Sequence, residues 1–461
     1  MSTQKSTFNF PVSIKETKVV YFIGIGGIGM SAIARYFNHL GIEVSGYDKT
    51  PTILTQQLEQ EGIKIHFEDD IALIPKQVDF VVYTPAIPSH HTELNYYKDH
   101  HYTVVKRSDV LQWITYNTFN ICVAGTHGKT TTSTMIGHVL RDTGYGCNAF
   151  LGGIAANYNS NFWSSNQNNV VVEADEYDRS FLKLAPNIAI ITSVDPDHLD
   201  IYGTAENVAN AFVEFSSKIK EGGCLIIKHG LKNANQFQIK DTCTYSVSNT
   251  EADIHIENLT VNNGAYHFNV INTYWRLDDV ILNMGGLHNI ENALAAIGVA
   301  KYLKIEDDKI KNALANFKGV KRRFEKILHN EHILIDDYAH HPEELRALIE
   351  GVRSLYPTHH LTLIFQPHLF SRTNDLADEF AASLDKADEV ILLPIYPARE
   401  LPMEGVTSKM IYDKMHLQNK KLMEKNEMLE YISFSKHTLI VMAGAGDIDV
   451  LVYSVKEILN N

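Results

Sequence analysis

The chain has few cysteines for its length, and they show no paired spacing. Cys122, Cys147, Cys224 and Cys243 are spread over 461 residues without a Cys-x-x-Cys motif. This pattern predicts neither a zinc site nor a redox pair, and so few thiols do not form the disulfide framework of a small secreted domain. It favours a reducing compartment, and we expect a cytoplasmic protein.

Long uninterrupted apolar segments are also missing. Residues 1–18 are polar and mixed in charge, without the apolar stretch of a signal peptide. The longest apolar run, 19–34, contains four glycines, which is typical of a strand, a turn and a helix rather than of a membrane span. We therefore expect no association with a membrane.

Positive charge is in deficit, because 41 Lys and Arg face 55 Asp and Glu, for a formal net charge of −14. General binding of nucleic acid needs a basic face, so we expect no nucleic-acid partner. Local binding of an anion by backbone N–H groups is still compatible with this charge. Hydrophobic residues at 44% are ordinary for a globular chain, and the length suggests about three domains.

Short β-branched strands alternate with helical segments through most of the chain. The predicted strands cover residues 19–25, 43–47, 79–83, 102–105, 120–124, 169–173, 187–192, 332–335, 361–365, 389–393 and 438–442. Such alternation predicts parallel sheets with right-handed crossovers.

The middle of the chain departs from this order. Residues 254–261 and 265–271 alternate with period two around Asn262-Asn263-Gly264, which predicts an antiparallel hairpin. We therefore predict a three-domain α/β protein with two Rossmann-like domains, at 1–117 and 322–461. Between them, residues 118–321 are expected to form the middle domain, which carries the antiparallel insert.

A first glycine loop follows the first strand. Gly24, Gly26, Gly27 and Gly29 fit the pattern G-x-G-x-x-G, and Asp48 follows the next strand at the position of a ribose-binding acid. The pattern predicts a diphosphate site at the start of a helix. It does not identify the nucleotide, and a tight turn without a ligand has the same sequence pattern.

A second loop is more informative. After strand 120–124 the sequence reads Gly125-Thr126-His127-Gly128-Lys129-Thr130-Thr131, and a helix begins at the threonines. Backbone N–H groups of such a loop surround phosphate oxygens, the lysine approaches the β- and γ-phosphates, and the first threonine hydroxyl is a ligand for Mg²⁺. Val123 replaces the first glycine of the common motif. The loop predicts ATP and Mg²⁺ as cofactors, and it indicates that residues 118–321 form a P-loop-type ATPase domain.

Acidic and imidazole side chains follow two later strands. Glu173, Asp175 and Glu176 come after an apolar strand, and His198 lies in an acidic loop after the next one. Ligands of open α/β sheets bind at such strand ends, and Mg²⁺ on phosphates needs only one or two protein carboxylates. We therefore predict Thr130 and Glu173 as ligands of one Mg²⁺. A lone histidine is often structural, but His198 lies in an acidic loop at a strand end, so we expect it to be functional.

With these loops in place, the sequence resembles the ATP-dependent Mur ligases of peptidoglycan synthesis over nearly its whole length. The resemblance rests on residues 24–29, 125–131, 173–176, 195–200, 286–296, 322–325, 336–342 and 365–368. It implies that ATP converts the lactyl carboxylate of UDP-N-acetylmuramate to an acyl phosphate, which the amine of L-alanine then attacks. A monomer or a homodimer is expected.

The resemblance also implies residue roles. The first glycine loop and Asp48 would hold the UDP group, and the second loop the phosphates of ATP. Asn289 and Asn292 would face the adenine, and Arg323 the terminal phosphate. The predicted catalytic residues are Lys129, His198, His340 and Arg372. For His340, a structural role beside Pro342 is an equal alternative, and His341 is expected to be structural.

The sequence departs from the family at two positions. Several Mur ligases carry a carbamoylated lysine where Phe212 stands here, and many relatives carry an arginine where this chain has Leu369. The resemblance implies that His198 would hold a second metal near the acyl phosphate. The first difference agrees with the alanine-adding branch and leaves this metal to His198 and solvent. The second removes one anchor for a substrate.

Three other functions are compatible with parts of the sequence. A recycling ligase of the same family would join a whole tripeptide to UDP-N-acetylmuramate, although its first loop usually lacks the pattern at 24–30. A nicotinamide-dependent oxidoreductase would use the first loop and leave the second without a role. A folate-polyglutamylating ligase would lack the N-terminal UDP-type unit.

Overall fold

The computed structural model describes residues 14, 16–237, 239–398, 400–434 and 437–460. They form two compact units. The first comprises the described residues up to Ile154 together with Ser160–Tyr245 and Ala295–Ile305, and the second comprises Ala155–Asn159, Ser246–Leu294 and the described residues from Glu306 onward. The domain boundaries expected at 117/118 and 321/322 remain predictions, and the first predicted domain begins outside the described residues.

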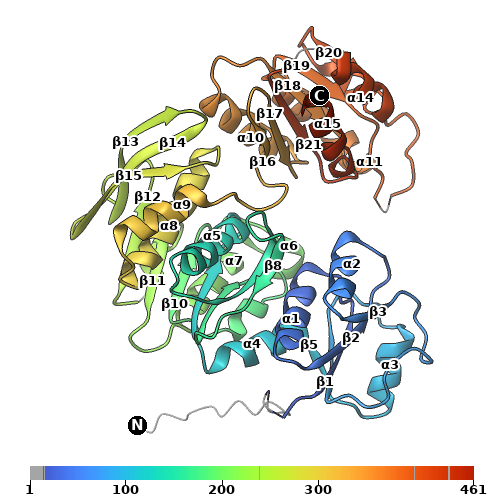
Figure 1. Ribbon diagram of the computed structural model, residues 1–461, viewed down its shortest axis with the longest axis vertical. Coiled ribbons are helices and arrows are strands. Elements are labelled where there is room, and N and C mark those ends of the chain that lie inside the picture. The colour runs from blue at the N-terminus through green and yellow to red at the C-terminus, as the bar shows by residue number, and fades with distance from the viewer. Residues whose placement is uncertain (1–13, 15, 238, 399, 435–436, 461) are drawn as a thin grey trace. The chain divides into compact units, whose positions relative to one another are not determined.

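The first unit opens with a parallel sheet of order β3-β2-β1-β4-β5. Its strands are β1 (Val19–Ile23), β2 (Glu43–Tyr47), β3 (Lys64–His66), β4 (Phe80–Tyr83) and β5 (Val104–Lys106). The helices are α1 (Ile28–His39), α2 (Ile53–Gln60), α3 (Thr92–Asp99) and α4 (Arg107–Tyr116). Successive side chains of a strand point to opposite faces, so Val20 and Phe22 join the core with α1 and α4, whereas Tyr21 and Ile23 pack with α3. Figure 1 shows α1 and α3 on opposite sides of this sheet.

A second sheet of the first unit runs in the order β12-β11-β10-β6-β9-β7-β8. Its strands are β6 (Phe119–Ala124), β7 (Asn148–Ala155), β8 (Ser160–Trp163), β9 (Asn169–Glu173), β10 (Ile188–Ile191), β11 (Cys224–Lys228) and β12 (Thr242–Ser246). The accompanying helices are α5 (Lys129–Asp142), η1 (Ser180–Lys183), α6 (Leu199–Tyr202), α7 (Ala205–Ser216) and η2 (Ala234–Gln236). Because β6 pairs in parallel with both β9 and β10, these three strands end at the same edge of the sheet.

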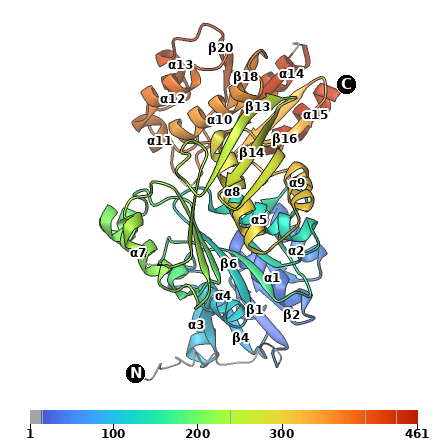
Figure 2. The same ribbon diagram turned by 90° about the vertical axis from the view of Figure 1, so that its left-hand side faces the viewer.

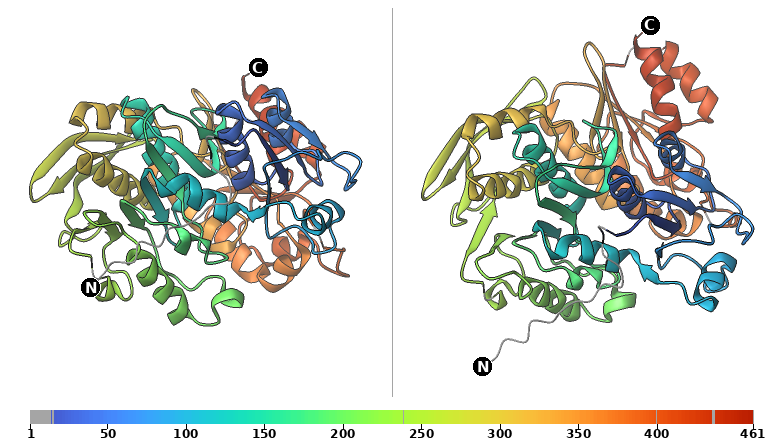
Figure 3. Two further views of the ribbon diagram at one scale, coloured as in Figure 1. Left: turned by 90° about the horizontal axis from the view of Figure 1, so that it is seen from below. Right: turned by 60° about the horizontal axis from the view of Figure 1, so that its bottom comes forward.

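The predicted antiparallel hairpin is confirmed in the second unit. β13 (Ile254–Asn262) and β14 (Ala265–Asn272) pair across the turn, and β15 (Trp275–Leu282) continues the meander. The long strands β13 and β14 run side by side in Figure 2. Two helices follow, α8 (Leu287–Tyr302) and α9 (Asp307–Asn316), and α9 packs on β15 (Figure 3).

The last sheet has the order β16-β17-β21-β18-β19-β20. Its strands are β16 (Glu325–His329), β17 (Ile333–Asp337), β18 (Leu361–Phe365), β19 (Glu389–Leu392), β20 (Lys420–Leu422) and β21 (Leu439–Ala443). Its helices are α10 (Pro342–Leu355), α11 (Phe370–Asp375), α12 (Ala377–Leu384), α13 (Lys409–Lys414), α14 (Lys425–Phe434) and α15 (Asp449–Asn460).

The order of this sheet differs from the prediction at one edge. Parallel strands were expected throughout, but β16 pairs antiparallel with β17 through a tight connection. A connection of three residues, 330–332, is too short for the crossover that a parallel pair needs. The other pairs of the sheet, from β17 to β20, are parallel as predicted.

Among the described residues, none of the helices combines the length and the hydropathy that crossing a lipid bilayer requires.

Candidate active site

The second glycine loop lies between β6 and α5, at the edge where β6, β9 and β10 end. Gly125 has φ +133° and Gly128 has φ +81°, backbone conformations that favour glycine. A Cβ at Gly125 would also collide with Thr192, which follows β10. The glycines therefore let the chain pass close to the neighbouring strand and turn into the helix.

Side chains after β10 hold this loop in shape. The Thr126 and Ser193 hydroxyls are 2.8 Å apart, and the His127 N–H donates to the Ser193 hydroxyl at 2.7 Å. The Asp195 N–H donates to the Thr126 hydroxyl at 3.1 Å. These hydrogen bonds fix the shape of the loop.

Lys129 begins α5 and forms a buried ion pair that the sequence did not predict. Its ammonium donates to the Gly125 carbonyl at 2.7 Å and to the Glu176 carboxylate at 2.8 Å. Glu176 is 1% exposed and Lys129 14%. Burial raises the pKa of Glu176, and the charge of Lys129 opposes that rise. Glu176 thus holds the Lys129 ammonium beside the loop, and the charge of Lys129 in turn favours the ionised form of the buried Glu176 carboxylate.

Thr130 and Glu173 face each other across the loop. The Thr130 hydroxyl donates to one Glu173 oxygen at 3.1 Å, and the Gly152 N–H donates to the other at 3.1 Å. Two adjacent oxygen ligands of octahedral Mg²⁺ lie about 2.9 Å apart. The separation of the Thr130 and Glu173 oxygens therefore fits the ion, and these residues would hold it. Gly152 is needed here, because a Cβ would collide with both carboxylate oxygens.

His198 lies near the same loop but with other partners. Its Nε2 is 3.9 Å from a Glu176 oxygen and 3.7 Å from an Asp197 oxygen. These three residues each offer one atom that could bind a metal ion, and the three atoms lie within 4.8 Å of one another. His198 has φ +51° and its ring packs edge-on against Tyr177. Phe212 is fully buried and packs on Phe181, so it belongs to the core. The assignment of His198 to a metal remains a prediction.

The first glycine loop joins β1 to α1. The Asp48 carboxylate accepts the Gly26 N–H at 2.7 Å, and the Gly24 N–H donates to the Tyr47 carbonyl at 2.8 Å. A Cβ at Gly26 would lie 2.8 Å from an Asp48 oxygen. Asp48 therefore shapes the loop in this structure, and its predicted contact with a ribose is not tested.

A cavity of about 470 Å³ connects the first glycine loop with the carboxylates after β9. It is lined on one side by residues 27–30 and on the other by Gly152, Glu173 and Asp175, with Arg107 between them. Both glycine loops belong to one compact unit, and the cavity reaches from the first loop to Glu173, one of the predicted metal ligands.

A buried network fixes the two walls of the cavity. The Arg35 guanidinium of α1 pairs with Glu61 at 2.7 Å and donates to the side chain of Asn161, which lies in β8. The Asn161 amide donates in turn to the Ser31 hydroxyl at 2.9 Å and to the Ile28 carbonyl. The first turn of α1 is thereby bonded to the second sheet.

In the second unit, the structure brings His340 and Arg372 together. The Arg372 guanidinium donates to the His340 carbonyl at 3.4 Å, and the rings of His340 and His368 are 5.8 Å apart. The His340 Nδ1 is hydrogen-bonded to the Tyr338 carbonyl at 2.8 Å. His341 is the N-cap residue of α10, which agrees with the structural role expected for it. Leu369 has φ +72° before α11 and supplies no charge.

The predicted adenine residues are neighbours at the start of α8. The Asn289 amide donates to the Gly285 carbonyl at 2.7 Å, and the Asn292 amide donates to the Asn289 side-chain oxygen at 3.1 Å. Arg323 is exposed in the segment before β16. Nearby, burial raises the pKa of Asp336 to about 7, partly opposed by Arg322. The contacts of these residues with ATP remain predictions.

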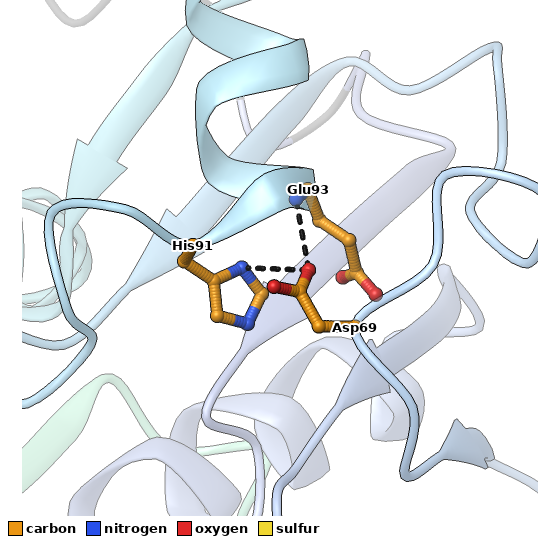
Figure 4. A group of neighbouring side chains, drawn as sticks. All are labelled: Asp69, His91 and Glu93. Carbon is orange, nitrogen blue, oxygen red and sulfur yellow. Dashed lines mark hydrogen bonds and ion pairs between the residues drawn. The ribbon is translucent and has the colours of Figure 1, made fainter.

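Another cluster of acidic and imidazole side chains, Asp69, His91 and Glu93, lies at the N-terminal end of α3 (Figure 4). Asp69 accepts the Thr92 and Glu93 N–H groups at 2.9 and 3.0 Å, and one of its oxygens is 3.3 Å from the His91 Nδ1. Glu93 accepts the Tyr21 hydroxyl at 2.6 Å. Asp69 therefore caps a helix and Glu93 is bonded to β1, so the fold already engages both carboxylates.

Three family models match the chain. The Mur ligase family, catalytic domain, matches residues 19–117, the Mur ligase middle domain matches 123–300, and the Mur ligase, glutamate ligase domain, matches 322–451. The predicted three-domain α/β architecture is confirmed by these matches and by the structural likeness below.

Relatives match over nearly the whole chain. The UDP-N-acetylmuramate–L-alanine ligase of Porphyromonas gingivalis is 49% identical over 451 residues, 96% of this chain and 99% of its own. That of Flavobacterium psychrophilum is 48% identical over 454 residues, 97% of this chain and 100% of its own. The crystal structure of the UDP-N-acetylmuramate-alanine ligase from Thermotoga maritima has a TM-score of 0.80 at 29% identity and covers 96% of this chain and 98% of its own. A murein peptide ligase from Psychrobacter arcticus, with a TM-score of 0.63 at 22% identity and coverage of 96% and 99%, shares the fold.

Proposed function

Because this chain belongs to the Mur ligase family, we propose that it joins L-alanine to the lactyl carboxylate of UDP-N-acetylmuramate, at the expense of ATP, in the synthesis of a peptidoglycan precursor. The observation that carries this proposal is the site in the first unit. Lys129 and Thr130 of the second glycine loop bond to Glu176 and Glu173, and Glu173 also lines the cavity that reaches the first glycine loop. The named relatives at 48–49% identity support the choice of substrates.

The chemistry requires activation of a carboxylate. A carboxylate does not react with an amine near neutral pH, because oxide is a poor leaving group. Transfer of the γ-phosphoryl group of ATP gives an acyl phosphate, the amine attacks its carbonyl carbon, and phosphate leaves. Several anions meet at one point, so positioning and neutralisation of charge do most of the catalytic work.

The residues of the first unit have separate tasks in this reaction. The N–H groups of loop 125–131 surround the phosphates, and Lys129 exchanges Glu176 for the β- and γ-phosphates. Thr130 and Glu173 would hold Mg²⁺, which supplies positive charge to neutralise phosphate oxygens. His198, with Asp197 and Glu176 beside it, would hold a second ion.

The second unit supplies the remaining groups. Asn289 and Asn292 contact the adenine, and Arg323 contacts the terminal phosphate. His340 and Arg372 hold the reacting carboxyl group and the incoming amino acid, since a guanidinium binds a carboxylate with two parallel hydrogen bonds. We further propose that the chain acts in the cytoplasm, in keeping with the buried thiols of Cys122, Cys147 and Cys224, as a monomer or a homodimer.

Release of phosphate from ATP tests this proposal. With UDP-N-acetylmuramate present, release should depend on L-alanine. Release only with a tripeptide would favour the recycling ligase, and oxidation of NADH without ATP would favour the oxidoreductase.

A further inference from the structure

The cavity of the first unit has an uneven distribution of charge. Its lining includes the three carboxylates of Glu173, Asp175 and Asp178. Of the described residues that line it, Arg107 alone is a lysine or arginine. A sugar nucleotide brings its own negative charges to this cavity, and among the described lining residues Arg107 alone offers its phosphates a permanently positive side chain.

Arg107 begins α4 and lies directly over the first glycine loop. A Cβ added at Gly29 would lie 2.6 Å from its Nη1 and 3.3 Å from its Cδ, so the glycine provides the space that the side chain occupies. On the other side, its Nη2 is 3.8 Å from an Asp175 oxygen. This distance is longer than a hydrogen bond, so Asp175 attracts the guanidinium without using its donors.

The helix that carries Arg107 is firmly attached. Val110 is fully buried in the core, and the Asp109 carboxylate accepts the Lys106 N–H at 3.1 Å. Lys183 of η1 donates to the Ser108 hydroxyl at 3.0 Å and pairs with Asp109. The backbone around Arg107 is therefore held in place by contacts of its neighbours in the chain. Only the side chain of Arg107, 24% exposed, has to adjust to a ligand.

We propose that Arg107 binds the diphosphate of the sugar nucleotide against the first glycine loop. This inference rests on the proposed function, which supplies the substrate. The guanidinium lies at Gly29, in the first turn of α1, where the helix start also attracts negative charge. The lactyl carboxylate must instead reach the side of the cavity that Glu173 lines, because phosphate is transferred near Glu173 and its partner Thr130. A guanidinium forms two parallel hydrogen bonds with a phosphate, which a lysine does not.

Binding measurements with three ligands test this assignment. The variant Arg107→Met keeps the aliphatic stem, and Arg107→Lys keeps the charge without the fork. We expect Arg107→Met to raise the Kd of UDP, UDP-N-acetylglucosamine and UDP-N-acetylmuramate alike, by about 10-fold to 100-fold, because charge-assisted hydrogen bonds are lost. Arg107→Lys should recover part of this loss. At saturating sugar nucleotide, kcat should change by less than about threefold, since a uniform loss of binding raises KM alone.

A matched control uses an arginine outside the cavity. Arg179 follows the same acidic segment, is 49% exposed and pairs with Glu214 at 3.5 Å. Arg179→Met makes the same change of side chain and charge, and it should alter each Kd by less than about twofold. Circular dichroism of each variant confirms that it is folded.

Two results would overturn the assignment. Unchanged Kd values in both Arg107 variants would show that the side chain does not bind the substrate. A loss confined to UDP-N-acetylmuramate would place Arg107 on the lactyl carboxylate instead. Failure of the proposed function is a separate outcome, because a wild-type chain that binds UDP but releases no phosphate with L-alanine would contradict the reaction and leave the contact with the diphosphate in place.

Discussion

The buried pair of Lys129 and Glu176 makes a prediction about stability as well as about catalysis. In Lys129→Met, the stem of the side chain remains and its charge is lost. Glu176 is 1% exposed, and with Lys129 gone no ammonium lies at 2.8 Å to balance its charge. Removing one partner of a buried pair costs about 3–5 kcal/mol when the other stays ionised.

The cost should depend on pH, with a sign that follows from the pKa of Glu176. Burial already raises this pKa in the wild type, and Lys129 opposes the rise; the variant therefore has a still higher folded pKa. An acid whose folded pKa exceeds its unfolded value destabilises the fold progressively as pH rises between the two values. The destabilisation should grow by up to about 1.4 kcal/mol per pH unit in that window and be smallest near pH 5.

Urea unfolding followed by circular dichroism checks this dependence. The difference in midpoint between wild type and Lys129→Met should widen from about pH 5.5 to about pH 7.5. The double variant Lys129→Met/Glu176→Gln removes the titrating group, so its stability should recover and lose this pH dependence, while turnover stays absent. Near-normal turnover of Lys129→Met would contradict the role of Lys129 at the phosphates of ATP. Equal destabilisation at both pH values would contradict the raised pKa of Glu176.

Two further changes test other parts of the structure. Gly152→Ala should displace the Glu173 carboxylate, because the added Cβ would collide with both oxygens. Turnover should fall at least about tenfold and require more Mg²⁺. Unchanged kinetics in a Mg²⁺ titration would argue against Glu173 as a ligand. Lys326 donates to the Gly264 carbonyl at 2.6 Å, and burial lowers its pKa to about 8. A base with a lowered folded pKa makes stability rise with pH, here from about pH 8 to about pH 10.5, and Lys326→Met should flatten that part of the urea-midpoint profile. A slope that persists in Lys326→Met would assign it to another group.

The parts of the site that follow from local pattern were predictable from the sequence. The strand at 169–173 and the phosphate loop at 125–131 depend on short-range periodicity and on glycines with positive φ. Glu173 could be placed because parallel strands end at one edge of a sheet. Several strands were missed, among them β3 and β20 with three residues each and β7, in which two adjacent glycines interrupt the apolar pattern.

The missed features depend on packing between distant segments. Glu176 lies 47 residues from Lys129, and nothing in the acidic run 173–176 says which carboxylate turns toward the lysine. Arg107 reaches Gly29 only because α4 packs beside α1. In β7, Gly152 weakens the strand pattern, yet it is the residue that leaves room for Glu173.

The proposed reaction requires that the two glycine loops of the first unit bind different ligands. The most direct measurement is a crystal structure of this chain with UDP-N-acetylmuramate and a non-hydrolysable analogue of ATP. We predict the diphosphate of the sugar nucleotide at residues 24–29 and the triphosphate at 125–131, with Lys129 turned from Glu176 to the phosphates. Preferred binding of a nicotinamide dinucleotide at the first loop would contradict the assignment of that loop to the sugar nucleotide. A second loop that stays empty at a saturating concentration of the ATP analogue would contradict its assignment to ATP.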